Sequence, residues 1–159
     1  MTLIDKEPVK RVKKILKQFE TNSEVVVLKS SARTALEAAK SLNCEVGAIV
    51  KSLLFKTEQN FILCLVAGDK KASLNKIKKI LNMKDVSMAS ADDVKNVTGF
   101  TIGGVSPIGH LNKIEILIDL SLKRFDELFA AAGHPNCIFK ISFEDLSKIT
   151  NGSIRELVE

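Results

Sequence analysis

Lys51 lies within an apolar run that is typical of a β-strand. The run spans residues 49–56, and the alternation of side chains along a strand places Lys51 on the face of Ile49, Leu53 and Phe55. An ammonium group on an apolar face is costly unless an anion or a hydrogen-bond acceptor meets it. Lys51 is therefore a candidate for holding an anionic ligand. The alternative is a lysine near a strand end whose amine reaches solvent along its aliphatic stem.

A glycine-rich loop is the second feature that could do chemistry. It reads Gly103-Gly104-Val105-Ser106-Pro107-Ile108-Gly109-His110. Its glycines allow a close approach of the backbone to a ligand, and the proline restricts its own φ and extends the residue before it. Such a loop can present backbone groups to an oxyanion or a ribose. It lacks the Gly-Lys-Ser/Thr ending of a phosphate-binding P-loop and the glycine spacing of a nucleophile elbow. The alternative is a tight structural crossover.

Two further reaction types are compatible with the residue types alone. Ser106, His110 and Asp119 could form a hydrolytic triad, although sequence order proves no geometry. Three cysteines, Cys44, Cys64 and Cys137, are an odd number without C-x-x-C spacing, which argues against a disulfide framework or a structural zinc site. Cys64 lies in an apolar run and is expected to be an inert core thiol. No metal spacing is present, so we expect neither a metal nor a cofactor.

The elements that must position these residues can be predicted from periodicity and capping patterns. Helices are expected at 8–19, 34–42, 73–81, 90–99 and 142–152. Strands are expected at 24–28, 49–56, 60–67, 86–89, 114–120 and 138–141, whereas residues 125–132 fit either a strand or a helix. The second and third strands form a hairpin. Irregular interleaving with hairpins predicts an α+β fold with a mixed sheet.

Composition sets the outer limits of the interpretation. The chain has 159 residues, the length of one domain, and 45% hydrophobic residues, enough for a core. Its 24 Lys and Arg exceed its 19 Asp and Glu, giving a net charge of +5. Lysines cluster at 10–17 and 70–84, and either cluster could follow phosphates or be a solvated helix face. Without a signal peptide or a membrane-spanning run, a cytoplasmic protein with no membrane partner is expected.

Three segments resemble the YbaK and prolyl-tRNA-synthetase-associated editing domain family. Residues 45–55 resemble its lysine strand, with Lys51 at the characteristic lysine. Residues 98–110 resemble its glycine–three residues–proline loop, with Gly103 and Pro107 as the pair. Residues 118–120, 129–133 and 146–152 resemble its C-terminal part. The resemblance covers about residues 21–152 in order, and a helix at 8–19 precedes it.

This resemblance implies a fold and a function. The fold would be a mixed, barrel-like sheet surrounded by helices in a single domain over residues 1–159. Family members hydrolyse the ester between a mischarged amino acid and the terminal adenosine of tRNA, with no metal or covalent intermediate expected, and some are thought to use the substrate's ribose hydroxyl to activate water. The resemblance implies catalytic roles for Lys51 and Gly103. It implies substrate binding by a larger set: Gly104, Ser106, Pro107, Gly109, His110 and Ala131.

One departure and several alternatives stay open. Some members have a serine near Ala131, so the amino acid removed cannot be carried over, although a small one is expected. The partners implied are a mischarged aminoacyl-tRNA and a synthetase acting separately, because the chain is too short to contain one. The oligomeric state is not readable. The rival functions are a non-catalytic module that binds tRNA or a nucleotide, and an esterase that uses the triad.

Overall fold

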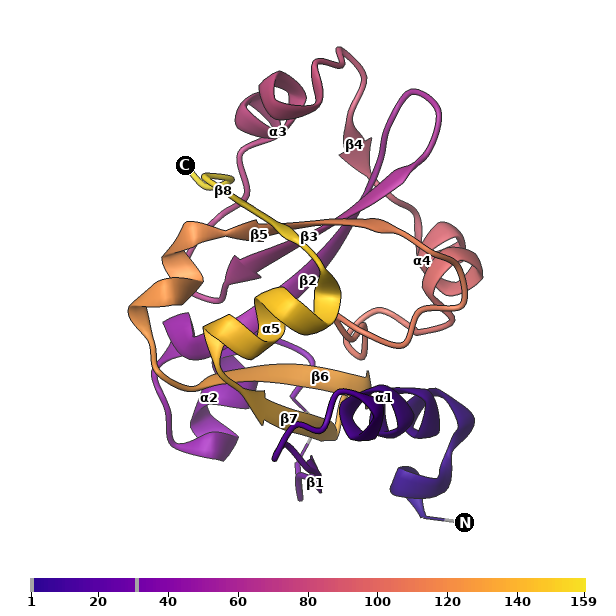
Figure 1. Cartoon of the computed structure of the whole chain (residues 1–159), viewed down its shortest axis with the longest axis vertical. Helices are drawn as coiled ribbons and strands as arrows, with labels where there is room; N and C mark the ends of the chain where they lie inside the picture. The colour runs from indigo at the N-terminus through magenta and orange to yellow at the C-terminus, as the bar shows by residue number, and fades with distance from the viewer. Residues whose placement is uncertain (1, 31) are drawn as a thin grey trace.

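The computed structural model describes residues 2–30 and 32–159, which form a mixed α+β fold (Figure 1). The α-helices in these ranges are α1 (Glu7–Gln18), α2 (Ala35–Leu42), α3 (Leu74–Leu81), α4 (Ala91–Thr98) and α5 (Phe143–Thr150). Short 3-10 helices are η1 (Leu3–Asp5), η2 (Val46–Ala48) and η3 (Leu120–Arg124). The strands are β1 (Val25–Val27), β2 (Ile49–Lys56), β3 (Phe61–Ala67), β4 (Ser87–Met88), β5 (Glu115–Asp119), β6 (Leu128–His134), β7 (Cys137–Ile141) and β8 (Ser153–Arg155). The predicted α+β class is confirmed.

All eight of these strands belong to one mixed sheet in the order β1-β7-β6-β2-β3-β5-β8, with β4 also paired to β2. The β2–β6, β3–β5 and β5–β8 pairs are parallel, and the other pairs are antiparallel. The sheet is open, since β1 and β8 are its two edges. Figure 1 shows α5 in front of the sheet, between the β6–β7 part and the β3–β5 part. The main apolar core fills this space and includes residues from α1, α5 and five strands.

Local capping explains where most helices begin. The hydroxyls of Ser73, Thr34, Ser90 and Ser142 each accept a hydrogen bond from the backbone N–H three residues later, at 3.1–3.2 Å. These bonds satisfy N–H groups that the first helical turn leaves without a partner. The expected helix starts at 34, 73, 90 and 142 are therefore confirmed within one residue. Gly99, with a φ of 78°, ends α4 as expected.

The conformation of two segments could not be predicted from local sequence patterns. The ambiguous segment 125–132 becomes the connection from η3 and most of β6. β8 was not expected, because its three residues are all exposed and carry no alternating pattern. It pairs with β5, and beyond it the Leu157 N–H donates to the buried carboxylate of Asp119 at 2.6 Å.

The N-terminal helix covers one end of the sheet. Val9, Val12 and Leu16 are buried in the main core, and α1 packs against β6. Gly133 in β6 allows this close approach, because a Cβ at this position would lie 2.9 Å from the Pro8 backbone. Among the described residues, no helix is both long enough and apolar enough to cross a membrane.

Candidate active site

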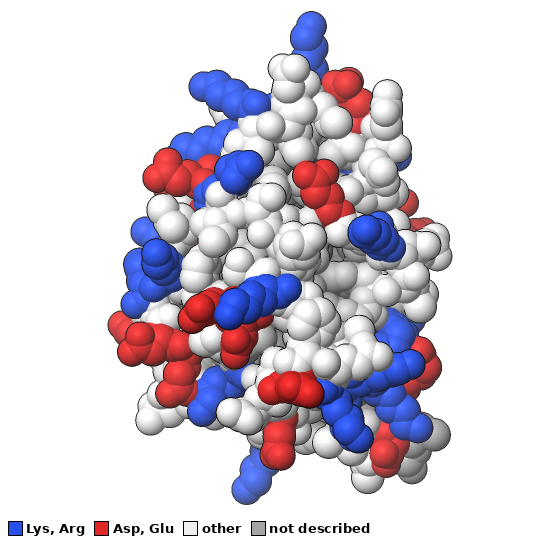
Figure 2. All heavy atoms as spheres, in the orientation of Figure 1, with Lys and Arg blue, Asp and Glu red and all other residues white. Residues whose placement is uncertain are grey.

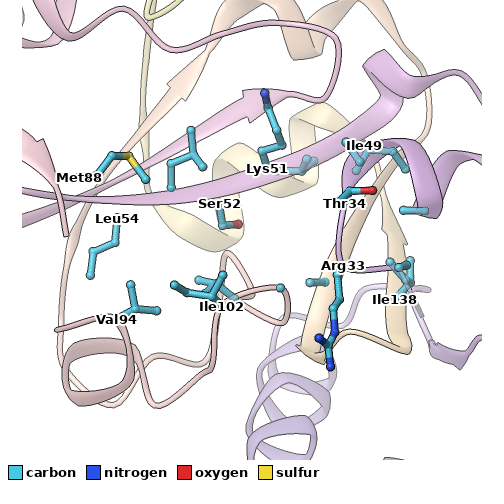
Figure 3. A pocket seen from close by; sticks show the side chains of 18 of the residues that line it. Arg33, Thr34, Ile49, Lys51, Ser52, Leu54, Met88, Val94, Ile102 and Ile138 are labelled. Carbon is cyan, nitrogen blue, oxygen red and sulfur yellow. The ribbon is translucent and has the colours of Figure 1, made fainter. Parts of the chain in front are cut away.

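A pocket opens where the sheet is interrupted beside β2. β2 pairs with β6 only through Ile49 and Val50, and with β4 only through Phe55 and Lys56. The edge of β2 between these pairs faces a pocket of about 370 Å³. Much of the wall is apolar, and the side chains that Figure 3 labels on it are Ile49, Leu54, Met88, Val94, Ile102 and Ile138. The pocket therefore combines an apolar wall with an open strand edge.

The open edge presents backbone groups of Ser52. The Ile49 carbonyl accepts from the Gly68 N–H at 2.8 Å on the β3 side, whereas the Leu54 carbonyl accepts from the Ala89 N–H at 3.0 Å on the opposite side. Backbone groups in an antiparallel pair alternate between the two edges from one residue to the next. Ser52 shares the parity of Leu54 and lies between the two paired regions. Its N–H and C=O are therefore directed to the pocket edge.

The Ser52 side chain adds a polar group to the same place. Its hydroxyl oxygen is buried and has no hydrogen-bond partner among the described residues. Figure 3 shows the side chain directed from β2 toward the space above Ile102. A buried hydroxyl without a partner is unfavourable, and a bound polar group would relieve that cost. Ser52 was not among the predicted site residues, although a hydroxyl between Val50 and Leu54 on an apolar strand face is a readable signal.

Lys51 is one of the residues that line the pocket, and its ammonium lies on the other side of β2 from Ser52 (Figure 3). The ammonium donates a hydrogen bond to the Lys70 carbonyl. Burial lowers the pKa of Lys51 from its ordinary value, and the nearby Asp69 carboxylate opposes this shift. Asp69 itself makes two hydrogen bonds with Arg124, at 2.7 and 3.0 Å. The expected acceptor for Lys51 is thus a backbone carbonyl in this structure.

The glycine loop contributes Gly103 to the pocket wall. Gly103 has a φ of 92°, a conformation that favours glycine. Its N–H has no hydrogen-bond partner among the described residues, whereas the Gly104 N–H donates to the Thr101 carbonyl at 2.9 Å. Gly104 is buried behind the wall, where a Cβ would lie 3.0 Å from the His134 backbone. Gly103 is therefore the loop glycine that has a free donor at the pocket.

The rest of the loop is fastened to the framework. Ser106 and Pro107 are buried, and the Ser106 hydroxyl accepts from the Ile108 N–H at 3.3 Å. The Gly109 carbonyl accepts from the Arg11 guanidinium of α1 at 2.8 Å. None of these residues is part of the pocket wall. Their expected contact with a substrate stays a prediction.

His110 is also held by the framework. Its Nε2 lies 2.7 Å from the Ser106 carbonyl, which can only accept, so Nε2 carries the hydrogen. The ring meets Phe100 edge-on, with 5.9 Å between the ring centroids. Burial lowers the pKa of His110, the hydrogen bond to Ser106 opposes this, and the Arg11 charge lowers it further.

The hydrogen bonds of the proposed triad run to backbone groups. His110 Nε2 is bound to the Ser106 carbonyl rather than to its hydroxyl. The two carboxylate oxygens of Asp119 accept from the N–H groups of Ser121, at 2.9 Å, and Leu157, at 2.6 Å. Asp119 therefore caps η3 and fixes the C-terminal segment, and nothing in this geometry links it to His110.

Two more segments complete the wall. Ala131 of β6 lines the pocket together with Ala38 of α2, and the expected contact of Ala131 with a substrate stays a prediction. Arg33 and Thr34 line it from the segment before α2. The Thr34 hydroxyl is used to cap α2, but the Arg33 side chain is exposed and was not predicted, because no local pattern distinguishes it.

Two groups of lysines lie on the surface of the molecule (Figure 2). Figure 2 shows both signs on the visible face, with cationic groups gathered near α1 at the lower right and near α3 at the upper left. The α1 group consists of exposed lysines: Lys10, Lys13, Lys14 and Lys17. The second group, Lys70, Lys71, Lys76, Lys78, Lys79 and Lys84, lies on and beside α3. Two separate basic faces therefore flank the molecule.

The cysteines lie outside the pocket wall and are free thiols. Burial is the main cause that raises the pKa of each thiol, to about 12 for Cys64. Nucleophilic thiolates need the opposite shift. Within residues 2–30 and 32–159, no group of three or more His, Cys, Asp or Glu side chains is placed to hold a metal ion.

Comparison with known proteins gives a consistent result. The sequence model of the aminoacyl-tRNA editing domain matches residues 29–149. YwhH of Bacillus subtilis (strain 168), an uncharacterized protein, is 32% identical over 143 residues, which cover 89% of this chain and 90% of YwhH. The proline–tRNA ligase of Kosmotoga olearia is 31% identical over 123 residues, which cover 77% of this chain but only 20% of the ligase. The chain thus spans about a fifth of that ligase.

A solved structure is similar over nearly the whole chain. The crystal structure of a candidate trans-editing enzyme for prolyl tRNA synthetase has a TM-score of 0.91 and 34% identity. The match covers 97% of this chain and 98% of that protein.

Proposed function

Because the chain belongs to the aminoacyl-tRNA editing domain family, we propose that it is an aminoacyl-tRNA deacylase. In this proposal it hydrolyses the ester that joins a wrongly attached small amino acid to the terminal adenosine of tRNA. The observation that carries the proposal is the pocket at the sheet break, which places an apolar wall beside free backbone and hydroxyl groups. An ester substrate needs both surfaces, one for the side chain and one for the reacting carbonyl.

The size and lining of the pocket support a small acyl group. Its volume of about 370 Å³ is within the usual range for small-molecule sites. Ala38, Ala131 and Val94 make part of the wall apolar. Removal of one methylene from a ligand changes its binding by only about 1–3 kcal/mol, so neighbouring small amino acids are discriminated modestly.

The chemistry in this proposal relies on positioning and on backbone dipoles. Water attacks the ester carbonyl, and the oxygen becomes negatively charged in the tetrahedral intermediate. The N–H groups of Gly103 and Ser52 are the candidate donors to that oxygen, because no described residue accepts from the Gly103 N–H and the Ser52 N–H faces the open edge. Donors fixed in a dry site stabilise such charge strongly. A ribose hydroxyl of the substrate would help to orient the water.

In the proposal, Lys51 binds an anionic part of the substrate. Its ammonium is held at the Lys70 carbonyl, and the residue is part of the pocket lining. The stem is flexible, so the ammonium can exchange the carbonyl for an anionic part of the substrate. A partly desolvated cation attracts an anion more strongly than one in bulk water.

The proposed activity does not require this domain to be part of a synthetase chain. The match with this chain covers only 20% of the ligase, but it covers 90% of YwhH and 98% of the candidate trans-editing enzyme whose crystal structure is known. We infer that residues 1–159 act as one editing unit, separate from the synthetase, on tRNA in the cytoplasm. Prolyl-tRNA synthetase is the synthetase that these comparisons favour as a partner.

The test is deacylation of tRNAs charged with alanine, serine, threonine, cysteine or proline. We expect the wild-type protein to hydrolyse one or two of these esters. Lys51→Ala should reduce the rate about 100-fold while circular dichroism shows an intact fold. A normal rate in this variant would remove Lys51 from the mechanism. No hydrolysis of any ester, with tRNA binding retained, would instead establish the non-catalytic binding module.

A further inference from the structure

We propose that Arg33 binds the 5′-phosphate of the terminal nucleotide, so that the acceptor strand leaves the pocket on the side of α1. This inference rests on the proposed function and adds an orientation of the substrate to it. Arg33 is part of the pocket wall, and its side chain is exposed. Figure 3 shows its guanidinium directed away from β2 and out of the pocket.

Arg33 is packed against the glycine loop. A Cβ on Gly103 would lie 3.4 Å from Arg33 Cγ and 3.6 Å from Pro135 Cγ. The arginine stem, the loop and the turn between β6 and β7 therefore meet at one point. A group bound by the guanidinium would lie at the rim, beside the free N–H of Gly103.

The Arg33 guanidinium is available for an anion. No described residue forms an ion pair or a hydrogen bond with it, whereas three other cations around the site are bound within the protein. Arg124 is bound to Asp69, Arg11 to Glu7 and the loop, and Lys51 to the Lys70 carbonyl. A guanidinium can bind two phosphate oxygens at once, which favours it over a lysine for this task.

Other positive charge lies on the same side. Lys6 and Arg33 are both close enough to His134 to lower its pKa, after the larger effect of burial. His134 Nδ1 accepts from the Asn136 N–H at 3.0 Å, which leaves Nε2 as the nitrogen that can donate. The rim around the β6–β7 turn is therefore positive and offers donors, which suits a nucleic acid backbone.

The pocket has an apolar end and a cationic end, which match the two ends of an aminoacyl nucleotide. Leu54, Met88 and Val94 lie together at one end in Figure 3, and Arg33 lies at the other. In an aminoacyl-adenosine, the acyl group and the 5′-phosphate are on opposite sides of the ribose. The apolar end would take the amino acid, and the Arg33 end would take the phosphate.

The experiment compares two stable amide analogues of the substrate, 3′-(alanylamino)-3′-deoxyadenosine and its 5′-phosphate. If the deacylation panel identifies an amino acid other than alanine, that amino acid replaces alanine in both analogues. Affinities are measured by calorimetry for the wild type, Arg33→Gln and a control, Lys40→Gln. Lys40 is exposed on α2, so the control removes the same charge away from the pocket.

We expect the wild type and Lys40→Gln to bind the phosphorylated analogue about 10-fold more tightly than the other analogue, and Arg33→Gln to bind both equally. A full phosphate preference in Arg33→Gln would overturn the inference and leave the proposed function standing. If the wild type binds neither analogue and hydrolyses no ester, the proposed function fails and this inference fails with it.

Discussion

His110 is held by the Ser106 carbonyl and the Phe100 ring, and this position predicts a loss of stability in mild acid. Burial lowers its pKa in the folded protein below the ordinary value of 6.5. Below that pH the unfolded chain binds the proton more readily, so the free energy of unfolding falls as the pH falls. One such group contributes at most about 1.4 kcal/mol between pH 7.5 and 5.5.

The measurement is urea unfolding of the wild type and His110→Gln at these two pH values. Glutamine keeps a donor for the Ser106 carbonyl but does not titrate. The wild type should lose more stability than the variant, by up to about 1.4 kcal/mol. The same loss in both proteins would show that His110 is not protonated preferentially on unfolding.

At the residue scale, sequence reasoning named Lys51, Gly103 and Ala131, which line the pocket, but it did not name Ser52 or Arg33. Parity along a strand predicted which side of β2 Lys51 occupies. Its acceptor, the Lys70 carbonyl, depends on how the segment after β3 is placed, which no local pattern encodes. Arg33 has no local pattern at all, because only the packing of its segment against the glycine loop brings it to the pocket.

At the scale of elements, two glycines with similar backbone conformations allow the packing of α1 on β6 to be tested. Gly133 has a φ of 94° and Gly103 a φ of 92°. A Cβ on Gly133 would also lie 2.9 Å from the Pro8 backbone of α1, whereas on Gly103 it would meet only side-chain atoms, at 3.4 Å or more. Both substitutions to alanine therefore carry the conformational cost, but only Gly133→Ala forces α1 away from β6.

Thermal and urea unfolding should separate the two effects. We expect Gly103→Ala to lower the free energy of unfolding by about 1 kcal/mol, the usual cost of a positive φ. Gly133→Ala should cost about 3 kcal/mol or more, because the steric conflict is added to it. Equal losses would mean that α1 adjusts freely, and would contradict its role as a fixed cover of the sheet.

The elements themselves were predictable where their causes are local. Helix starts at Thr34, Ser90 and Ser142 follow from a hydrogen bond that spans three residues, so the sequence pattern is sufficient. β8 takes its conformation from β5, which is more than 30 residues away in the chain, and its own residues carry no strand pattern. Strand pairing of this kind is decided by the whole fold.

At the scale of the whole molecule, the site is a property of the sheet order. The pocket exists because β6 and β4 each pair with a different end of β2 and leave its middle unpaired. The residues that line it come from α2 and the segment before it, from β2, β4, β6, β7 and α4, and from the glycine loop with the residue before it. Sequence analysis predicted several of these pieces separately. It could not predict their meeting point, since the register of the sheet sets it.

A larger side chain in this pocket should slow hydrolysis of the ester, and this is the most direct test of the proposed active site. Ala131 lies on its wall, so Ala131→Leu replaces a methyl by an isobutyl group in the space assigned to the acyl chain, while Ala91→Leu makes the same change on the exposed surface of α4. The measurement is single-turnover hydrolysis of the tRNA ester that the wild type cleaves. We predict that Ala131→Leu is at least about 10-fold slower and that Ala91→Leu is unchanged, with both proteins folded. A wild-type rate in folded Ala131→Leu would show that the ester is not hydrolysed in this pocket.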